Sequence, residues 1–190
     1  MEFVQPIRDR KQLESMKKLL RGSENGLRNH CLFTFGINSG LRVSDLLALK
    51  IEDVLDERGK VRDRINLREK KTGKMKDFPI GANAKKSLME YISSRGEYDR
   101  HDVLFRSKKG GSLSRNQAWK ILNDCAKGIG ITENIGTHTL RKTFGYHAYM
   151  LGTDITRIQK LLNHSSPGIT LAYIGITQDE LDDVYLSLDL

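Results

Sequence analysis

Four clusters of residues in this chain have the types and spacing needed to act on a phosphate group. The first is the segment HTLR, whose three-residue offset places His138 and Arg141 on one face of a helix. Arginine binds phosphate oxygens through two parallel hydrogen bonds, and histidine can transfer a proton near pH 7. Gly136 and Thr137 lie just before the segment, as a flexible entry and an expected N-cap. Taken alone, the pattern is also common by chance on solvent-exposed helices.

The other three clusters each place a reactive side chain beside a turn or a helix start. Arg42 follows a glycine at a loop-to-helix junction, and Asp45 lies three residues further on, where it can orient the guanidinium. Lys71 precedes a tight turn at the tip of the charged hairpin REKKTGKMKDFPI, and His164 precedes a helix that carries Tyr173 two turns along. A tyrosine hydroxyl needs a base or cationic neighbours before it becomes a good nucleophile. Each cluster alone also has an ordinary structural explanation.

The elements that position these residues follow from the hydrophobic periodicity. Short runs of branched residues between residues 51 and 80, with turns at Gly59 and Gly73, predict three short antiparallel strands. An apolar helix over residues 27–38 stops at Gly40, and a short helix starts at Ser44. The other helices are expected over residues 9–20, 82–94, 114–127, 138–151, 154–163 and 167–175. The fold class is therefore α+β, a mainly helical domain with one small three-stranded antiparallel β-sheet.

Charge separates the body of the chain from its C-terminal tail. The chain has 32 Lys and Arg against 24 Asp and Glu, a formal charge of +8. Residues 177–190 carry five acids and no Lys or Arg, so residues 1–176 carry the whole basic excess. Such a body attracts polyanions such as nucleic acid. No apolar run is long enough for a membrane span, no secretory pattern is seen, and Cys31 and Cys125 are expected as free thiols of a cytoplasmic protein.

The order of the four clusters resembles the signature of the tyrosine recombinases, the family of phage integrases and Xer-type resolvases. The likeness runs from about residue 9 to residue 176, and it includes the segments SGLRVSDLLALK, KKTGKMKDFPI, HTLRKTFGYHAYMLG and LLNHSSPGITLAYIGI. It implies the DNA breaking-rejoining fold and site-specific recombination of double-stranded DNA. It also implies a bacterial, phage or mobile-element origin and a reaction without cofactor, metal or ATP.

The resemblance also implies six catalytic residues, which are Arg42, Lys71, His138, Arg141, His164 and Tyr173. The two arginines would grip the scissile phosphate, and the lysine would protonate the departing 5′ oxygen. The first histidine would take the proton of the tyrosine, and the second would hydrogen-bond the phosphate. The tyrosine would form a 3′-phosphotyrosyl bond, which a 5′-hydroxyl then attacks. Asp45 would support the site from behind, and four lysines would contact DNA: Lys70, Lys74, Lys76 and Lys142.

Three positions depart from the pattern of the family. Asn163 stands where a glycine usually precedes the second histidine, and asparagine tolerates left-handed backbone better than most residues. Thr139 stands where relatives often have an acid, and Lys142 where they often have histidine. None of these changes removes a catalytic group.

The organisation expected from the resemblance is a catalytic domain over residues 1–176 and an acidic tail helix over 177–190. The tail docks on a neighbouring protomer or folds back on its own domain, and the N-terminal core-binding domain of full-length relatives is expected to be absent. The expected assembly is a homo-oligomer, a tetramer on DNA with a monomer as the alternative when free. The main functional alternative is a catalytically silent DNA-binding accessory protein on the same fold. A phosphohydrolase using His138 and a type IB topoisomerase rank lower.

Overall fold

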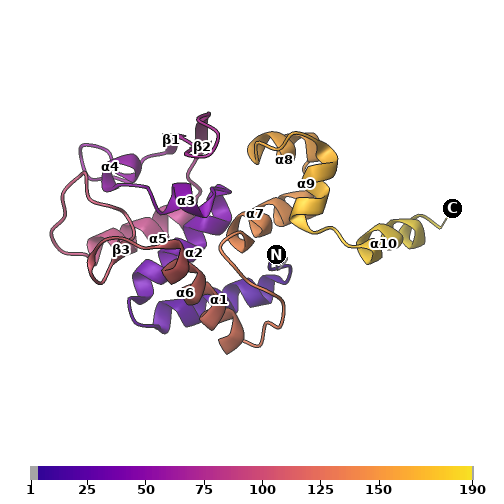
Figure 1. Cartoon of the computed structure of the whole chain (residues 1–190), viewed down its shortest axis with the longest axis horizontal. Coiled ribbons are helices and arrows are strands. Elements are labelled where there is room, and N and C mark those ends of the chain that lie inside the picture. Colours follow the sequence, from indigo (N-terminus) through magenta and orange to yellow (C-terminus); the bar gives the residue numbers. More distant parts are fainter. Residues whose placement is uncertain (1–3, 190) are drawn as a thin grey trace.

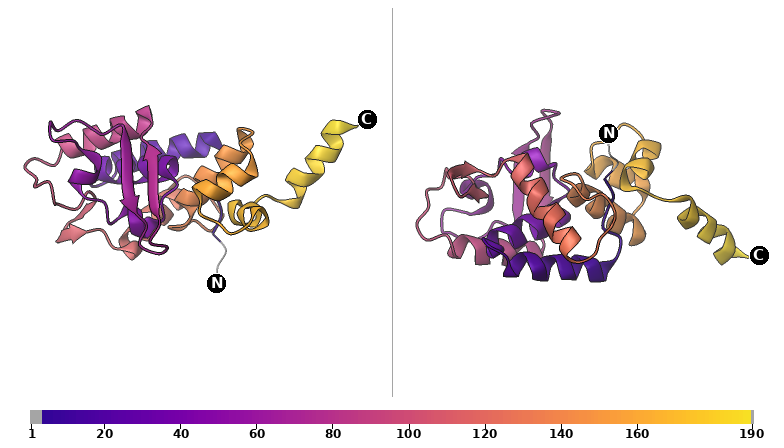
Figure 2. Two further views of the ribbon diagram at one scale, coloured as in Figure 1. Left: turned by 90° about the horizontal axis from the view of Figure 1, so that it is seen from above. Right: turned by 60° about the horizontal axis from the view of Figure 1, so that its bottom comes forward.

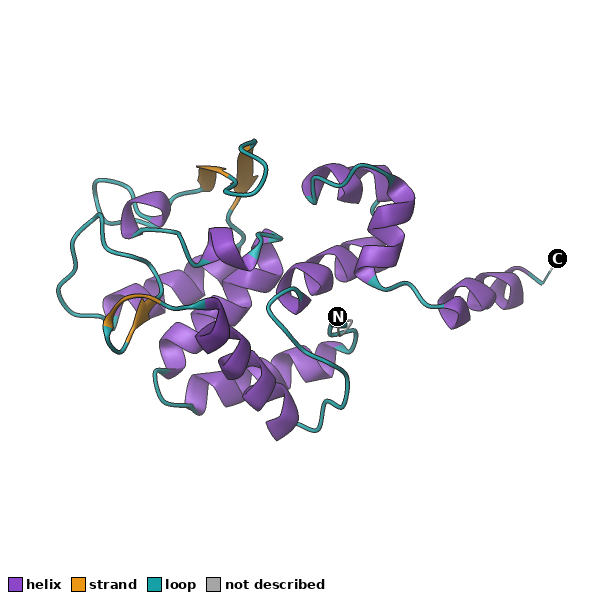
Figure 3. Cartoon of the chain, in the orientation of Figure 1, coloured by secondary structure: helices purple, strands orange, loops and turns teal. Residues whose placement is uncertain are grey.

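Ten helices and two short hairpins make up the part of the chain that the computed structural model describes, residues 4–189 (Figures 1 and 3). Residues 1–3 of the expected catalytic domain and Leu190 of the expected tail helix lie outside the described residues. The elements are α1 (Arg10–Gly22), α2 (Gly26–Ser39), α3 (Val43–Leu46), α4 (Ile51–Val54), β1 (Arg64–Arg68), β2 (Met75–Pro79), α5 (Ala82–Ser93), β3 (Arg106–Ser107), β4 (Gly110–Ser112), α6 (Arg115–Gly128), α7 (Thr139–Met150), α8 (Ile155–Leu161), α9 (Pro167–Ile174) and α10 (Gln178–Leu188).

Helix α2 is the central element of the larger core. Leu32, Phe33 and Phe35 are almost completely buried, and polar residues of the helix such as Arg28, Asn29 and Thr34 are buried as well. The helix contacts α1, α5 and α7. It ends at Gly40, as predicted, with left-handed backbone at φ 58°. This turn leads directly into the segment that carries Arg42.

The predicted helices are all present, and their ends agree to within a few residues. One detail differs at the start of α7, where His138 rather than Thr137 occupies the N-cap position and makes no side-chain cap hydrogen bond. One short helix, α4, was not expected. Its sequence IEDV has two acids in the first turn, and the Asp53 carboxylate accepts from the backbone N–H of Lys50, which stabilises a helical turn.

The fold class is confirmed, but the strands are divided differently from the prediction. Strands β1 and β2 form a two-stranded antiparallel hairpin, in which Arg64 pairs with Pro79 and Arg68 with Met75 (Figure 2, left). The expected third strand is reduced to a single bridge between Leu55 and Val61, because α4 occupies the preceding residues. A second small hairpin, β3–β4, forms between α5 and α6 and was not expected.

Helices α7, α8 and α9 form a second, smaller core. It is built on Tyr146, Ile158, Leu162 and Ile174. Gly145 allows the close approach, since a Cβ there would lie 2.7 Å from Ile174 and 3.1 Å from Leu162. This core holds α9 against α7.

Helix α10 projects away from the body of the molecule (Figures 1 and 2). Near its start, the Tyr146 hydroxyl donates to the Glu180 carboxylate at 2.7 Å. The helix carries an apolar stripe that is exposed to solvent, made of Leu181, Val184, Tyr185 and Leu188. Cys31 and Cys125 are buried free thiols, as expected. No helix within residues 4–189 has the length and apolar character that a membrane crossing requires.

Candidate active site

The six predicted catalytic residues come from four separate parts of the fold that meet beside the N-terminus of α7. Arg42 precedes α3, and Lys71 lies in the turn between β1 and β2. His138 occupies the N-cap position of α7, the helix that also carries Arg141. The turn between α8 and α9 supplies the second histidine, and α9 supplies the tyrosine. The β1–β2 hairpin and the α8–α9 segment rise from the same edge of the body (Figure 1).

The Arg141 side chain is 2% exposed, and two backbone carbonyls hold its guanidinium in place. Its Nη1 donates to the Gly40 carbonyl at 2.6 Å, and its Nη2 donates to the Leu162 carbonyl. A buried guanidinium must have its donors satisfied, and these two carbonyls fix the plane of the group. The turn that ends α2 and the end of α8 therefore both aim Arg141.

Arg42 lies beside a buried carboxylate that the sequence analysis did not single out. Its Nη1 is 2.7 Å from Oε2 of Glu69, and the Glu69 side chain has no exposed surface. The Arg141 Nη1 lies 3.9 Å from the other oxygen, Oε1, of the same carboxylate. One acid thus lies between the two arginines that the resemblance assigns to the phosphate.

Tyr173 and His138 form the pair expected of a nucleophile and a base. The tyrosine hydroxyl lies 3.4 Å from Nδ1 of the histidine. Burial raises the pKa of Tyr173, although the guanidiniums of Arg141 and Arg42 oppose that effect. Desolvation lowers the pKa of His138, and nearby cations, Arg115 first among them, lower it further. The imidazole is therefore neutral at pH 7 and able to accept the phenolic proton.

The second histidine, His164, follows a left-handed residue, as the sequence suggested. Asn163 has φ 49°, so asparagine adopts the conformation for which relatives use glycine. The His164 Nδ1 lies 3.2 Å from the Thr170 hydroxyl, and its ring meets the Tyr173 ring edge-on at 4.7 Å. Desolvation, followed by the charges of Arg141 and Arg42, lowers the pKa of His164 to about 4.

Lys71 lies exposed at the tip of the hairpin, and a buried acid holds the base of that tip. Oδ1 of Asp45 accepts from the backbone N–H of Lys70 at 2.9 Å, and Asp45 is 4% exposed. Asp45 therefore holds the backbone of the residue directly before Lys71. Lys71 also contributes to the lowered pKa of His138, which puts its charge on the same side of the molecule as the histidine.

The four lysines expected to contact DNA fall into two pairs. Lys70 and Lys74 are exposed on the hairpin. Lys76 is buried, with Nζ donating to the carbonyls of Gly40 at 3.1 Å and Leu161 at 3.3 Å. Burial, followed by the charge of Arg141, lowers the pKa of Lys76 to about 8. Lys142 is also buried, with Nζ 5.2 Å from the centre of the Tyr173 ring. The second pair is therefore buried in the free protein.

Glu69 and Lys76 are the residues of this region whose positions sequence reasoning missed. One signal was present for Glu69, because it is the single acid in the stretch from Arg64 to Lys76. An acid surrounded by basic residues can mark a buried partner for a cation. Within residues 4–189, no group of three or more His, Cys, Asp or Glu side chains has the arrangement of a metal site.

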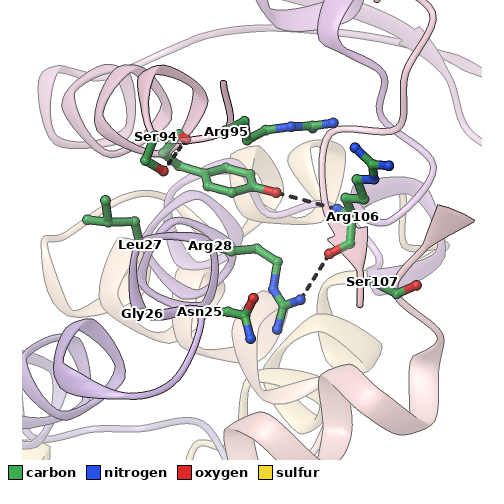
Figure 4. A pocket seen from close by; sticks show the side chains of 9 residues that line it. Asn25, Gly26, Leu27, Arg28, Ser94, Arg95, Arg106 and Ser107 are labelled. Carbon is green, nitrogen blue, oxygen red and sulfur yellow. Dashed lines mark hydrogen bonds between the residues drawn. The ribbon is translucent and has the colours of Figure 1, made fainter. Parts of the chain in front are cut away.

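A separate cavity of about 380 Å³ lies between the start of α2, the end of α5 and β3 (Figure 4). Arg28, Arg95 and Arg106 line it, but the first two use their guanidiniums within the protein. Arg28 Nη1 donates to the Arg106 carbonyl at 2.9 Å, and Arg95 Nη1 donates to the carbonyls of Val103 and Leu104 at 2.7 and 2.8 Å. None of the candidate catalytic residues lines this cavity, and the hydrogen bonds of Arg28 and Arg95 connect the elements around it.

Comparison with known proteins agrees with the geometry. The model of the phage integrase family matches residues 8–180. The probable integrase/recombinase YoeC of Bacillus subtilis is 41% identical over 186 residues, which cover 97% of each chain. The tyrosine recombinase XerD of Listeria innocua is 33% identical over 91% of this chain, and the match spans 60% of XerD. The chain belongs to the phage integrase family, and it is a tyrosine-type recombinase.

Solved structures show the same architecture. The crystal structure of XerA recombinase superimposes with a TM-score of 0.77 at 25% identity, over 96% of this chain and 64% of XerA. The XerH recombinase in its post-cleavage complex with palindromic difH substrate gives a TM-score of 0.77 at 23% identity, over 96% of this chain and 52% of XerH. At that identity the second likeness concerns the fold alone. The chain thus spans between half and two thirds of these structural relatives.

Proposed function

We propose that this chain is a site-specific DNA recombinase that cleaves and rejoins DNA strands through a 3′-phosphotyrosyl intermediate on Tyr173. The observation that carries the proposal is the Tyr173 hydroxyl, 3.4 Å from a neutral His138 and beside two arginines fixed in a largely buried position. A nucleophile, a base and fixed cations are the three parts that phosphoryl transfer to a side chain requires.

In the cleavage step, the Tyr173 oxygen forms a bond to phosphorus and the bond from phosphorus to the 5′ oxygen breaks. His138 takes the phenolic proton, and Lys71 gives a proton to the departing 5′ oxygen. Arg42 and Arg141 stabilise the negative charge that builds on the phosphate oxygens. A 5′-hydroxyl then attacks the phosphotyrosyl bond and releases Tyr173. The number of phosphoester bonds is conserved, so the cycle needs no external source of energy.

His164 has a specific requirement before it can donate to the phosphate. The Thr170 hydroxyl lies 3.0 Å from the Ser166 carbonyl, so its hydrogen points there and its oxygen accepts from His164 Nδ1. With Nδ1 protonated, the neutral ring keeps only an acceptor at Nε2. We propose that the bound phosphate raises the pKa of His164 and that the imidazolium then donates from Nε2.

The proposed partner is double-stranded DNA, and the proposed assembly is a homo-oligomer, a tetramer on DNA. Lys70 and Lys74 are the exposed cations that we assign to the phosphate backbone, and this role is not carried over to the buried Lys76 and Lys142. Solved relatives include a lambda integrase dimer bound to a core site.

We assign residues 1–176 to the catalytic domain and 177–190 to a tail that docks on a neighbouring protomer, because the stripe around Tyr185 is exposed. The buried free thiols and the DNA substrate favour the cytoplasm.

The competing function, a catalytically silent DNA-binding protein, lacks a comparable observation in its favour. All six positions carry the residue type that the proposed chemistry needs, and the Tyr173 hydroxyl lies within 3.4 Å of His138. The deciding experiment offers the chain a nicked suicide substrate that carries the recombination site of its own genetic element. We expect a covalent protein–DNA adduct that disappears in Tyr173→Phe while DNA binding remains. An adduct that persists in this variant would refute the nucleophile, and DNA binding without any adduct would favour the silent protein.

A further inference from the structure

We propose that Glu69 is a positioning residue, which holds Arg42 and the Lys71 turn in their working arrangement before DNA binds. The inference rests on the proposed function, since it assigns a second layer to the same site. It concerns a residue that touches neither the nucleophile nor the proposed general base. Its effect on the reaction is exerted through the arginine and the lysine turn.

The Glu69 carboxylate joins four different parts of the fold. It is completely buried, so every contact it makes is with protein. Oε2 receives three partners, which are Arg42 Nη1 at 2.7 Å, Thr72 Oγ1 at 2.8 Å and Asn163 Nδ2 at 2.9 Å. Oε1 makes no hydrogen bond within residues 4–189, and it lies 3.9 Å from the fourth partner, Arg141 Nη1, in a longer ion pair. A buried carboxylate with this many donors has one position, and it imposes that position on its partners.

The same residue also closes the turn that presents Lys71. The backbone N–H of Glu69 donates to the Lys74 carbonyl at 2.9 Å, and its carbonyl accepts from the Gly73 N–H at 2.8 Å. On one side of Lys71, the Lys70 N–H is held by Asp45, and on the other the Thr72 hydroxyl is held by Glu69. Two buried carboxylates therefore bracket the lysine, and the flexible part of the general acid is limited to its own side chain.

The contact with Asn163 extends this arrangement to the turn that carries the second histidine. A glycine at this position would give the same left-handed turn but no side chain to reach Glu69. Asn163 supplies both the backbone conformation and an amide donor. Asn163, which stands where the family usually has glycine, thus makes a contact that glycine could not make, with a residue 94 positions away in the chain.

The charge state of Glu69 fits this role. Burial acts to raise the pKa of the carboxyl, but the hydrogen bonds from Thr72, Arg42 and Asn163 outweigh burial and lower it. The group is therefore ionised at neutral pH. A carboxylate would repel a DNA phosphate at short range, so its useful effect is to fix the cations that do face the phosphate.

The test compares Glu69→Gln with Glu57→Gln, a matched change of an exposed acid at residue 57, ahead of the same hairpin. Single-turnover cleavage is measured on two suicide substrates, one normal and one with sulfur in place of the bridging 5′ oxygen. A thiolate leaves without protonation, so a defect in the general acid largely disappears on the sulfur substrate. We expect Glu69→Gln to slow cleavage of the normal substrate roughly 10- to 100-fold, as small misplacements of catalytic groups do. On the sulfur substrate the defect should shrink several-fold, while Glu57→Gln matches the wild type on both.

A second variant, Asn163→Gly, keeps the left-handed turn and removes only the amide, and thermal unfolding checks that each variant is folded. It should slow cleavage by about 5-fold, the equivalent of one hydrogen bond, and its effect should not add to that of Glu69→Gln. Wild-type rates in folded Glu69→Gln would overturn the inference, as would an equal defect on both substrates. If Glu69→Gln does not fold, a wild-type rate in Asn163→Gly overturns it. Absence of an adduct in the wild type would instead refute the proposed function.

Discussion

Gly40→Ala is expected to destabilise the fold and weaken the site together. Gly40 ends α2 with φ 58°, and a Cβ there would lie 2.7 and 2.9 Å from two ring carbons of Phe144. The left-handed backbone costs about 1 to 2 kcal/mol for an L-residue. Forcing the ring aside adds about 1 to 3 kcal/mol, as overpacking of a core does. The expected loss in the free energy of unfolding is therefore roughly 2 to 5 kcal/mol.

The same change should affect catalysis, because the Gly40 carbonyl accepts from both Arg141 and Lys76. Any shift of this carbonyl moves two of the buried cations. We therefore expect a fall in the single-turnover rate of adduct formation, measured where the variant is still fully folded. Binding of DNA at low salt should change much less, since the exposed lysines of the hairpin are untouched.

The matched control is Gly59→Ala. Gly59 also has positive φ, 74°, but a Cβ there would meet nothing within 4 Å. It isolates the backbone cost, so it should lose only about 1 to 2 kcal/mol and keep the wild-type cleavage rate. Urea unfolding followed by circular dichroism measures both variants. If Gly40→Ala loses no more stability than Gly59→Ala, the steric account of this turn is wrong.

Three further predictions concern protons and the tail. The rate of adduct formation should fall as the pH drops below the pKa of His138, which lies under its ordinary value of 6.5. The reason is that a protonated imidazole cannot accept the proton of Tyr173. The variant His138→Gln should react more slowly, and its pH profile should lack this fall at acid pH. The folded pKa of His164, about 4, lies below its ordinary value, so the unfolded chain binds this proton first as pH falls. The wild type should therefore lose more stability between pH 6.5 and 4 than His164→Gln, as urea unfolding at each pH can measure. Deleting residues 178–190 should leave thermal stability nearly unchanged but prevent higher-order complexes on DNA in a gel-shift assay, and unaltered assembly would exclude the docking role.

The sequence was enough to predict most of the elements and to select the residues that we assign to the chemistry, because both are encoded locally. His138 and Arg141 are three residues apart, and Gly40 marks the end of its helix without reference to distant residues. The strands were less predictable. The segment at residues 51–54 has branched residues typical of a strand, but its two acids favour a helical turn. The tertiary context decided between these local preferences.

Asp45 was expected as a supporting residue, but Glu69 and the buried position of Lys76 could not be predicted, because their partners are distant in the chain. Glu69 meets Asn163 across 94 residues, and Lys76 meets Leu161 across 85. A lysine in a basic hairpin gives no local sign that it is buried in the free protein, so the sequence did not separate Lys76 from the other lysines expected to contact DNA. Only the packing of the hairpin against the end of α8 distinguishes Lys76 from the exposed Lys74.

The buried charges of this region do not cancel, which suits a site that we propose to bind an anion. Arg42, Arg141 and Lys76 lie around two buried carboxylates, Asp45 and Glu69, and Lys142 adds a further buried cation beside the Tyr173 ring. The backbone carbonyls that accept from Arg141 and Lys76 compensate only partly for the positive excess. Burial strengthens the interaction between charges, so we expect the proposed phosphodiester to be attracted more strongly here than at an exposed basic surface. The two carboxylates reduce the repulsion among the cations in the free protein, and they leave an excess for the anion.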